Sequence, residues 1–227
     1  KRQSLGTASS GADVRHEKRG LFDKRSYLQR MYSCVPYRGW VLKVTPERKL
    51  VPLASGLRTP NGLGFDLDGN LFVTGNQGDW VGTSKLHHVE EGKFYGHPGS
   101  LIWKKAWGKD RPVDKPLNEL DSLRETAAVL FPHGLMANSP SQPLVDSTGG
   151  KFGPYQGQLL VGEMNKRRIM RVMLEEVGGK LQGACAPFFD GNGLSTGNNR
   201  LCFSKDGKKL WIGHSSHGWA GSRGIQT

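Results

Sequence analysis

Side chains able to bind or transform a small molecule occur in three short polar segments, each directly after an apolar run. These segments are Asn76-Gln77-Gly78-Asp79, Glu163-Met164-Asn165 and His214-Ser215-Ser216-His217. Amides, carboxylates and imidazoles hydrogen-bond ligands and move protons, and loops that converge on one face commonly form binding sites. In the alternative interpretation these side chains cap strand ends and bond neighbouring backbone, as Asn, Asp and Ser do in turns.

Histidine supplies the candidates for proton transfer. His133 lies in the loop-like segment Phe131-Pro132-His133-Gly134-Leu135, and an unperturbed imidazole with a pKa near ~6.5 can act as a general base at neutral pH. The alternative is a structural histidine held by hydrogen bonds. His214 and His217 are close enough in sequence to share a metal ion, although no carboxylate partner is evident. His87 and His88 are adjacent on an expected strand and therefore point to opposite faces.

A repeated unit of strand, Asp-Gly turn and strand positions these polar segments. Residues 62–65 and 71–74 flank the turn 66–70, residues 200–203 and 210–213 flank the turn 204–208, and residues 157–162 form a partial copy. The Asp-Gly pairs supply the positive φ angles of a tight hairpin turn. Further β-rich runs occur at 40–44, 50–53, 85–89 and 168–173. Repeated antiparallel units of this kind are typical of β-propeller blades.

We therefore predict an all-β fold, a partial β-propeller of about three to four blades. The propeller segment spans residues 37–227 and carries one helical insertion at about 99–130, with the helix itself from Leu117 to Val129. Residues 1–36 are expected to form a basic leader that is flexible or loosely packed. The remaining propeller blades are expected outside this chain, because an open set of blades leaves strand edges exposed.

Composition limits the class of protein. The chain has 227 residues, 36% of them hydrophobic, and 32 glycines without a collagen period, which excludes a disordered chain. It contains no apolar run long enough to span a bilayer, and no Cys-x-x-Cys-His motif, so no haem is expected to be attached within this chain. The net charge of +12 comes from widely spread lysines and arginines, which does not favour nucleic-acid binding. Because the first residue is Lys1 and no signal peptide is visible, we expect a processed or excised piece.

The residues of one region resemble a known family. The matching segments are Arg58-Thr59-Pro60-Asn61-Gly62-Leu63-Gly64-Phe65, Asp68-Gly69-Asn70-Leu71, Asn76-Gln77-Gly78 and Gly92-Lys93-Phe94-Tyr95-Gly96-His97-Pro98. They resemble the soluble quinoprotein glucose/sorbosone dehydrogenases, and residues 131–224 look like the dehydrogenase-like propellers of large secreted bacterial proteins. The resemblance implies a six-bladed β-propeller and an oxidoreductase that oxidises a sugar or alcohol with pyrroloquinoline quinone (PQQ) held through calcium.

By position, the resemblance assigns Arg58, Asn61, Gln77 and Gly78 to cofactor binding, and Gly78 with Asp79 to the calcium ion. A guanidinium suits the carboxylates and oxygens of the quinone, and calcium prefers oxygen donors. The resemblance also implies a c-type cytochrome as electron acceptor and a periplasmic or secreted location. It leaves the catalytic base unknown, because nothing before residue 58 matches the histidine of the family.

Two functions remain open at this stage. Retention of Arg58, Gln77-Gly78 and Tyr95-Gly96 favours a sugar or alcohol dehydrogenase. The Ser84-Lys85 pair, which replaces an acidic pair of the family, favours a non-catalytic β-propeller that binds carbohydrate or protein. The aromatic side chains have the same ambiguity, since they can stack on sugar rings or be buried between blades: Trp80, Trp103, Trp107 and Trp219.

Overall fold

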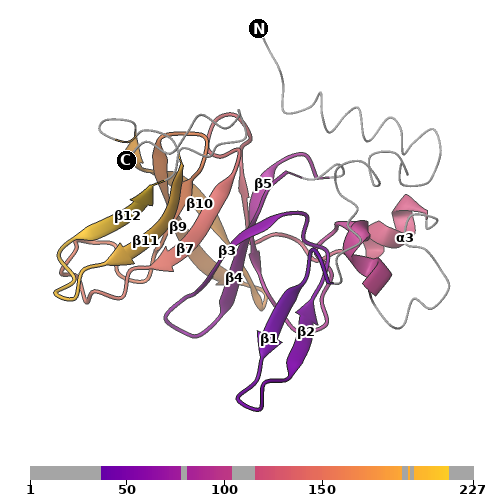
Figure 1. The fold of residues 1–227 in the computed structure, drawn as a ribbon. Helices are drawn as coiled ribbons and strands as arrows, with labels where there is room; N and C mark the ends of the chain where they lie inside the picture. The colour runs from indigo at the N-terminus through magenta and orange to yellow at the C-terminus, as the bar shows by residue number, and fades with distance from the viewer. Residues whose placement is uncertain (1–36, 78–80, 104–115, 191–193, 195–196, 215–227) are drawn as a thin grey trace, which may run out of the picture. The chain divides into compact units, whose positions relative to one another are not determined.

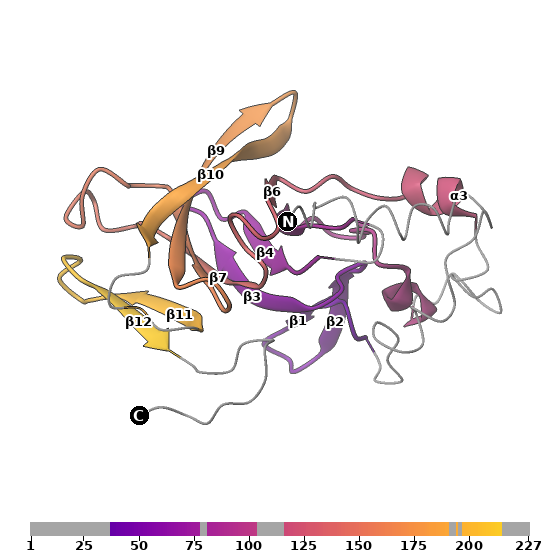
Figure 2. The ribbon, with the colours of Figure 1, turned by 90° about the horizontal axis from the view of Figure 1, so that it is seen from above.

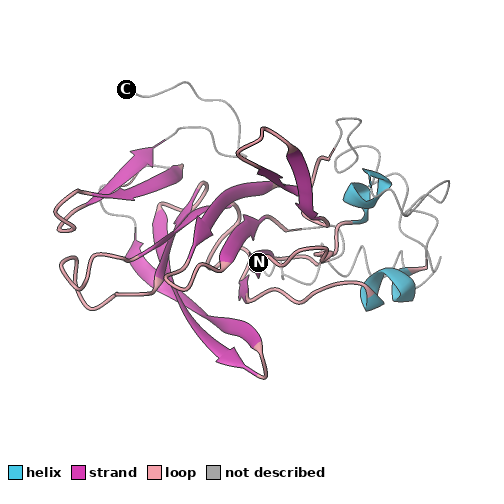
Figure 3. Cartoon of the chain, turned by 90° about the horizontal axis from the view of Figure 1, so that it is seen from below, coloured by secondary structure: helices cyan, strands magenta, loops and turns pink. Residues whose placement is uncertain are grey.

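The computed structural model describes residues 37–77, 81–103, 116–190, 194 and 197–214. The predicted leader 1–36 lies outside these residues, and so do several candidates: Gly78, Asp79, Trp80, Trp107, His217 and Trp219. The described residues are strands and connecting loops with two short helical segments (Figure 3), and they form two compact units that are treated separately below. In this described part of the chain, no helix is long and apolar enough to cross a membrane.

The larger unit is built from three antiparallel sheets, with strands from residues 60–76, 83–88 and 127–227. The first sheet has the strand order β3 (Pro60–Phe65), β4 (Leu71–Gly75), β5 (Ser84–His88) and β6 (Val129–Phe131). The second has the order β7 (Pro140–Val145), β8 (Leu159–Glu163), β9 (Arg168–Val177) and β10 (Lys180–Asp190). The third pairs β11 (Asn198–Phe203) with β12 (Leu210–His214) and packs against β7 and β8 (Figure 1).

Two hydrophobic cores hold the three sheets together. The side chains of β8 alternate between them: Leu159 and Val161 face the core shared with Phe72 of the first sheet, whereas Leu160 faces the core shared with Leu201 of the third. Successive side chains of a strand point to opposite faces, so a strand between two cores must be apolar on both. This layering explains the uninterrupted apolar run 159–161 and confirms the predicted all-β arrangement of propeller blades.

Glycine allows β3 to approach β7 closely. A Cβ atom at Gly62 would lie 2.3 Å from the Cα of Gln142, and one at Gly64 would lie 2.1 Å from the carbonyl oxygen of Pro143. Neither distance leaves room for a methyl group, so these two glycines are required by packing between the sheets. The glycines of the predicted Pro-Asn-Gly-Leu-Gly segment thus serve the contact between neighbouring blades.

The smaller unit contains the hairpin of β1 (Val41–Val44) and β2 (Leu50–Ala54), the 3-10 helix η2 (Pro98–Trp103) and the helix α3 (Leu117–Ser122). Its core includes the Phe94-Tyr95 pair of the resemblance, whose side chains are almost fully buried. The Tyr95 hydroxyl accepts the backbone N–H of Glu90 at 2.8 Å, and burial raises the pKa of Tyr95 to about 12. This part of the family-like pattern therefore supports the fold of the smaller unit.

The insertion differs from its prediction. The helix ends at Ser122 rather than Val129, and residues 129–131 form β6, the outer strand of the first sheet. The cause is burial: Val129 and Phe131 are buried in the core with Leu86, and pairing with β5 outweighs the local helical pattern.

The structure also contains strands that the sequence did not reveal, namely β7 and β10. The β9–β10 hairpin turns at Gly178 and Gly179, whose positive φ angles of 59° and 76° are typical of a two-residue turn. It extends away from the other strands of its unit (Figure 2). The sequence did not predict these strands because they contain proline and glycine, which are poor strand formers. The residues are Pro140 and Pro143 in β7, and Gly183 and Pro187 in β10.

Candidate functional site

Polar side chains gather at one edge of the sheets in the larger unit. Because the strands are antiparallel, the starts of β3, β5, β7, β9 and β11 lie at the same edge as the ends of β4, β6, β8, β10 and β12. We name this edge the polar edge and define it by the following residues: Asn61, Asn76, Lys85, the β6–β7 loop 132–139, Glu163, the β8–β9 loop 164–167, Arg168, Asp190, Asn198 and His214. Here hydrogen bonds join the loops from separate repeats that carry Asn76, Glu163 and Asn165.

Glu163 joins two loops of the polar edge. Its fully buried carboxylate accepts the backbone N–H groups of Asn138 and Ser139 on one oxygen, at 2.9 and 2.5 Å. The other oxygen accepts the N–H groups of Asn165, at 2.7 Å, and Lys166. Burial raises the pKa of the Glu163 carboxyl, and the four N–H donors act in the opposite direction. Four donors demand an ionised acceptor, so Glu163 connects loops, as in the structural interpretation of this residue.

The end of β4 is linked to the β6–β7 loop. The Asn76 side-chain amide donates to the Ser139 hydroxyl at 3.2 Å, and the Ser84 hydroxyl donates to the carbonyl of Asn138 at 3.0 Å. Lys85 is buried, and its ammonium group donates to the carbonyl oxygens of Thr83 at 2.9 Å and Asn76 at 3.4 Å. A cation is therefore fixed next to the chain segment that leads into Gln77.

A second cation orders the other side of the polar edge. The Arg168 guanidinium makes two hydrogen bonds to the Asp190 carboxylate, at 2.5 and 2.8 Å, and donates to the Leu135 carbonyl at 2.5 Å. The backbone carbonyl of Arg168 accepts the side-chain amide of Asn198 at 3.1 Å. Sequence reasoning missed Lys85 and Arg168 as members of the site. The available signal was that both residues lie at the start of a strand, Lys85 in β5 and Arg168 in β9.

His133 lies on the β6–β7 loop with a half-buried side chain. Its Nδ1 atom is buried and has no hydrogen-bond partner among the described residues. Burial, and secondly the positive charge of Lys166, lower the pKa of the imidazole from its ordinary value of 6.5. The lowered pKa favours the neutral imidazole, which is the form that accepts a proton.

The cofactor and metal residues predicted from the resemblance fall in different parts of the chain. Asn61 is half-buried in β3 at the polar edge. Arg58 and Gln77 belong to the smaller unit, and the structure does not describe Gly78 and Asp79. His214 ends β12 with an exposed side chain. No three His, Cys, Asp or Glu side chains are grouped to hold a metal ion within the described ranges.

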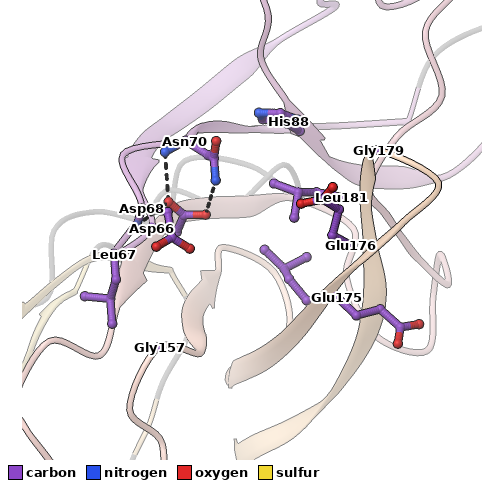
Figure 4. A pocket seen from close by; sticks show the side chains of 11 residues that line it. Asp66, Leu67, Asp68, Asn70, His88, Gly157, Glu175, Glu176, Gly179 and Leu181 are labelled. Atoms are coloured by element: carbon purple, nitrogen blue, oxygen red, sulfur yellow. Dashed lines mark hydrogen bonds between the residues drawn. The ribbon is translucent and has the colours of Figure 1, made fainter.

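A pocket of about 680 Å³ lies at the opposite edge of the same sheets. The turn 66–70, His88 at the end of β5 and the β9–β10 hairpin line it (Figure 4). The Asp66 carboxylate is occupied by its own turn, because it accepts the N–H groups of Asp68 and Asn70 and the side-chain amide of Asn70. The lining also contains Asp68 and the Glu175-Glu176 pair, so this pocket is acidic and repels anions.

Comparison with known proteins identifies the fold. No family model matches the chain, and no curated protein matches it. Among solved structures it is similar to a Thermus thermophilus protein assigned as an oxidoreductase (glucose dehydrogenase), with a TM-score of 0.53 at 20% identity over 85% of this chain. It is also similar to the PQQ-bound aldose sugar dehydrogenase of Streptomyces coelicolor, with a TM-score of 0.51 at 19% identity over 84% of this chain.

A third similar structure is the holo form of the pyranose dehydrogenase PQQ domain of Coprinopsis cinerea, with a TM-score of 0.52 at 13% identity over 86% of this chain. The chain spans 53%, 48% and 62% of the lengths of these three proteins, in the same order. The fold is therefore that of the β-propellers of sugar dehydrogenases, as the resemblance predicts, and this chain comprises about half of such a domain.

Proposed function

We propose that this chain forms part of a quinoprotein dehydrogenase that oxidises a sugar or alcohol with PQQ. The observation that carries the proposal is its fold, shared with three proteins named as sugar dehydrogenases, two of them described with PQQ. The family-like pattern of residues 58–98 supports the same assignment. The proposal concerns the whole protein, because the blades outside this chain would contribute to the same site.

The chemistry of the polar edge fits such a cofactor. PQQ carries carboxylates and quinone oxygens, so it needs cations and hydrogen-bond donors. The polar edge carries the positive charges of Lys85 and Lys166 together with the side-chain amides of Asn61 and Asn76. Its two described carboxylates are occupied: Glu163 by backbone N–H groups and Asp190 by Arg168. The positive charges of Lys85 and Lys166 at this edge support binding of an anion.

The remaining assignments follow the resemblance. Arg58 and Gln77 would bind the quinone, and oxygens of Gly78 and Asp79 would bind the calcium ion. The bound quinone would supply the two-electron oxidation of a sugar or alcohol hydroxyl. A c-type cytochrome would receive the electrons, and the protein would act in the periplasm or outside the cell.

Titration of the protein with PQQ, followed by absorbance with and without calcium, tests this proposal. We expect saturable, calcium-dependent binding that Arg58→Ala weakens about tenfold or more, the equivalent of about 1.4 kcal/mol. Arg38→Ala is the matched control, since Arg38 is an exposed arginine of the same unit outside the family-like pattern. Absence of PQQ binding would rule out the quinoprotein function, and equal loss in both variants would rule out the role of Arg58.

A further inference from the structure

The loop that joins β7 to β8 contains a second group of buried polar side chains, away from the polar edge. Asp146 begins this loop and is fully buried. The Asp146 N–H donates to the carbonyl of Gln158 at 2.8 Å, and the Asp146 carbonyl accepts the N–H of Gly157 at 2.9 Å. Gly157 has a positive φ angle of 80°, so residues 157 and 158 form a β-bulge opposite Asp146. The bulge holds Asp146 and Gln158 next to each other.

The side chains of Asp146 and Gln158 point to the same face of the second sheet. Leu144 and Leu160, each two residues away from one of them, pack in the core shared with the third sheet, and side chains two positions apart in a strand share a face. Arg171 lies on this face as well, because it pairs with Leu160 across β8 and β9. It is then the diagonal neighbour of Gln158, about 7–8 Å away and within reach of long side chains.

Each of these three side chains has a buried polar atom that the protein leaves unpartnered. The Asp146 Oδ1 atom accepts the N–H of Thr148 at 2.8 Å, whereas its Oδ2 atom has no hydrogen-bond partner in the described part of the chain. The same is true of Gln158 Oε1 and Arg171 Nε. Native proteins satisfy such atoms with protein groups, ordered water or ions. Two acceptors and one donor therefore require a shared ligand.

Aromatic rings cover this face of the sheet. Phe152 and Tyr155, both from the loop, pack against Phe188 with ring centroids 5.9 and 5.1 Å apart, and Phe152 contacts Phe203 of the third sheet at 5.0 Å. The guanidinium carbon of Arg171 lies 5.6 Å from the centre of the Tyr155 ring. The ligand must be small, because the atoms that would bind it are buried. The positive charge of Arg171 disfavours a metal ion there, which favours a neutral ligand.

We propose that Asp146, Gln158 and Arg171 bind one ordered water molecule. A water molecule can donate two hydrogen bonds, to Asp146 Oδ2 and Gln158 Oε1, and accept a third from Arg171 Nε. These three bonds satisfy all three unpartnered atoms at once. The water connects β7, β8 and β9 beneath the loop 146–158 and compensates the burial of the Asp146 carboxylate. This site does not depend on the proposed dehydrogenase function.

NMR spectroscopy of the full chain without PQQ tests the site, because a long-lived internal water gives nuclear Overhauser cross-peaks to nearby amide protons. We expect such a cross-peak at the N–H of Thr148, which donates to the same carboxylate. Gln158→Met keeps the length of the side chain but removes the acceptor oxygen, and it should abolish the cross-peak. Gln182→Met changes an exposed glutamine of β10 and should retain it.

Several results would overturn this proposal. One is a wild-type protein without a water cross-peak at Thr148, which is decisive even if a variant fails to fold. Another is a cross-peak that persists in Gln158→Met. A Tm that rises with added Ca²⁺ in the wild type but not in Asp146→Asn would assign a cation instead of water. Slow exchange of the Gln158 side-chain NH2 protons, with no water cross-peak, would show a direct bond to Asp146.

Discussion

The two edges of the sheets in the larger unit carry ionisable groups in opposite arrangements. At the polar edge, the carboxylates of Glu163 and Asp190 are bound by N–H donors and a guanidinium, and the Lys85 ammonium group is bound by carbonyl oxygens. At the other edge, the pocket beside the β9–β10 hairpin is lined by Asp68, Glu175 and Glu176. The edge that carries this pocket is thus the one that disfavours an anionic cofactor.

The difference between the edges shows that the hydrogen-bond partners of a carboxylate, rather than its presence alone, decide its role. Glu163 and Glu175 are both strand residues, but the first is completely buried with four donors, and the second is exposed with one weak contact to Gln182 at 3.4 Å. The buried carboxylate holds two loops together, whereas the exposed one adds negative electrostatic potential at the surface.

The largest effect is expected from Glu163→Gln. An amide in place of the carboxylate turns an NH2 group toward backbone N–H donors and leaves them unsatisfied, at a cost of about 3 kcal/mol in the free energy of unfolding. Glu175→Gln should change it by less than about 0.5 kcal/mol. Urea denaturation of the two variants measures the difference, and equal stabilities would show that the loop connection is energetically unimportant.

Gly62→Ala should follow, with a loss of about 2 kcal/mol. The added Cβ atom would meet the backbone of Gln142 at 2.3 Å, and backbone cannot move aside as a flexible side chain can. Gly75→Ala is the control, because its Cβ would find only the His87 ring, at 3.7 Å. Thermal unfolding of both variants would refute the close packing of β3 on β7 if Gly62→Ala were as stable as Gly75→Ala.

The hairpin turns and strand β8 show what the sequence can predict. The Asp-Gly turns placed the hairpins of β3–β4 and β11–β12 correctly, because both turns need glycine: Gly69 and Gly207 have φ angles of 85° and 73°. The alternation of Leu159, Leu160 and Val161 between two cores follows from a continuous apolar strand. Local patterns of turn and burial therefore predicted most of the fold.

The rest depends on contacts between distant residues. The sequence could not show that Glu163 binds backbone 24 and 25 residues earlier, because backbone N–H groups carry no residue identity. It could not show that pairing with β5 turns residues 129–131 into a strand. Lys85 was noted as a departure from the family pattern, and its burial beside Asn76 became evident only from the structure.

Lys85→Met should weaken PQQ binding about tenfold, or about 1.4 kcal/mol, because it removes a cation from the polar edge. Lys180→Met changes an exposed lysine at the start of β10, near the acidic pocket, and should leave the affinity unchanged. Isothermal titration of both variants with PQQ measures the contrast. Unaltered binding by Lys85→Met would remove this lysine from the cofactor site.

The smallest effect concerns pH. The folded pKa of His133 lies below its ordinary 6.5, so the unfolded chain binds more protons at mildly acidic pH. Stability should therefore rise with pH through this window and fall as pH drops from about 6.5 toward the folded pKa. His133→Gln should flatten the slope of Tm against pH, and His88→Gln should not. A slope unchanged in His133→Gln would show that another group causes it.

The most direct measurement of the central claim is the location of bound PQQ on the molecule. Backbone amide NMR shifts can be recorded while PQQ and calcium are added to the protein. We predict the largest perturbations at Asn61, at Asn76 and in the β6–β7 loop, with the turn 66–70 and the tip of the β9–β10 hairpin unchanged. Perturbations centred on that turn and hairpin, or none at any residue, would contradict the assignment of the polar edge as the cofactor site.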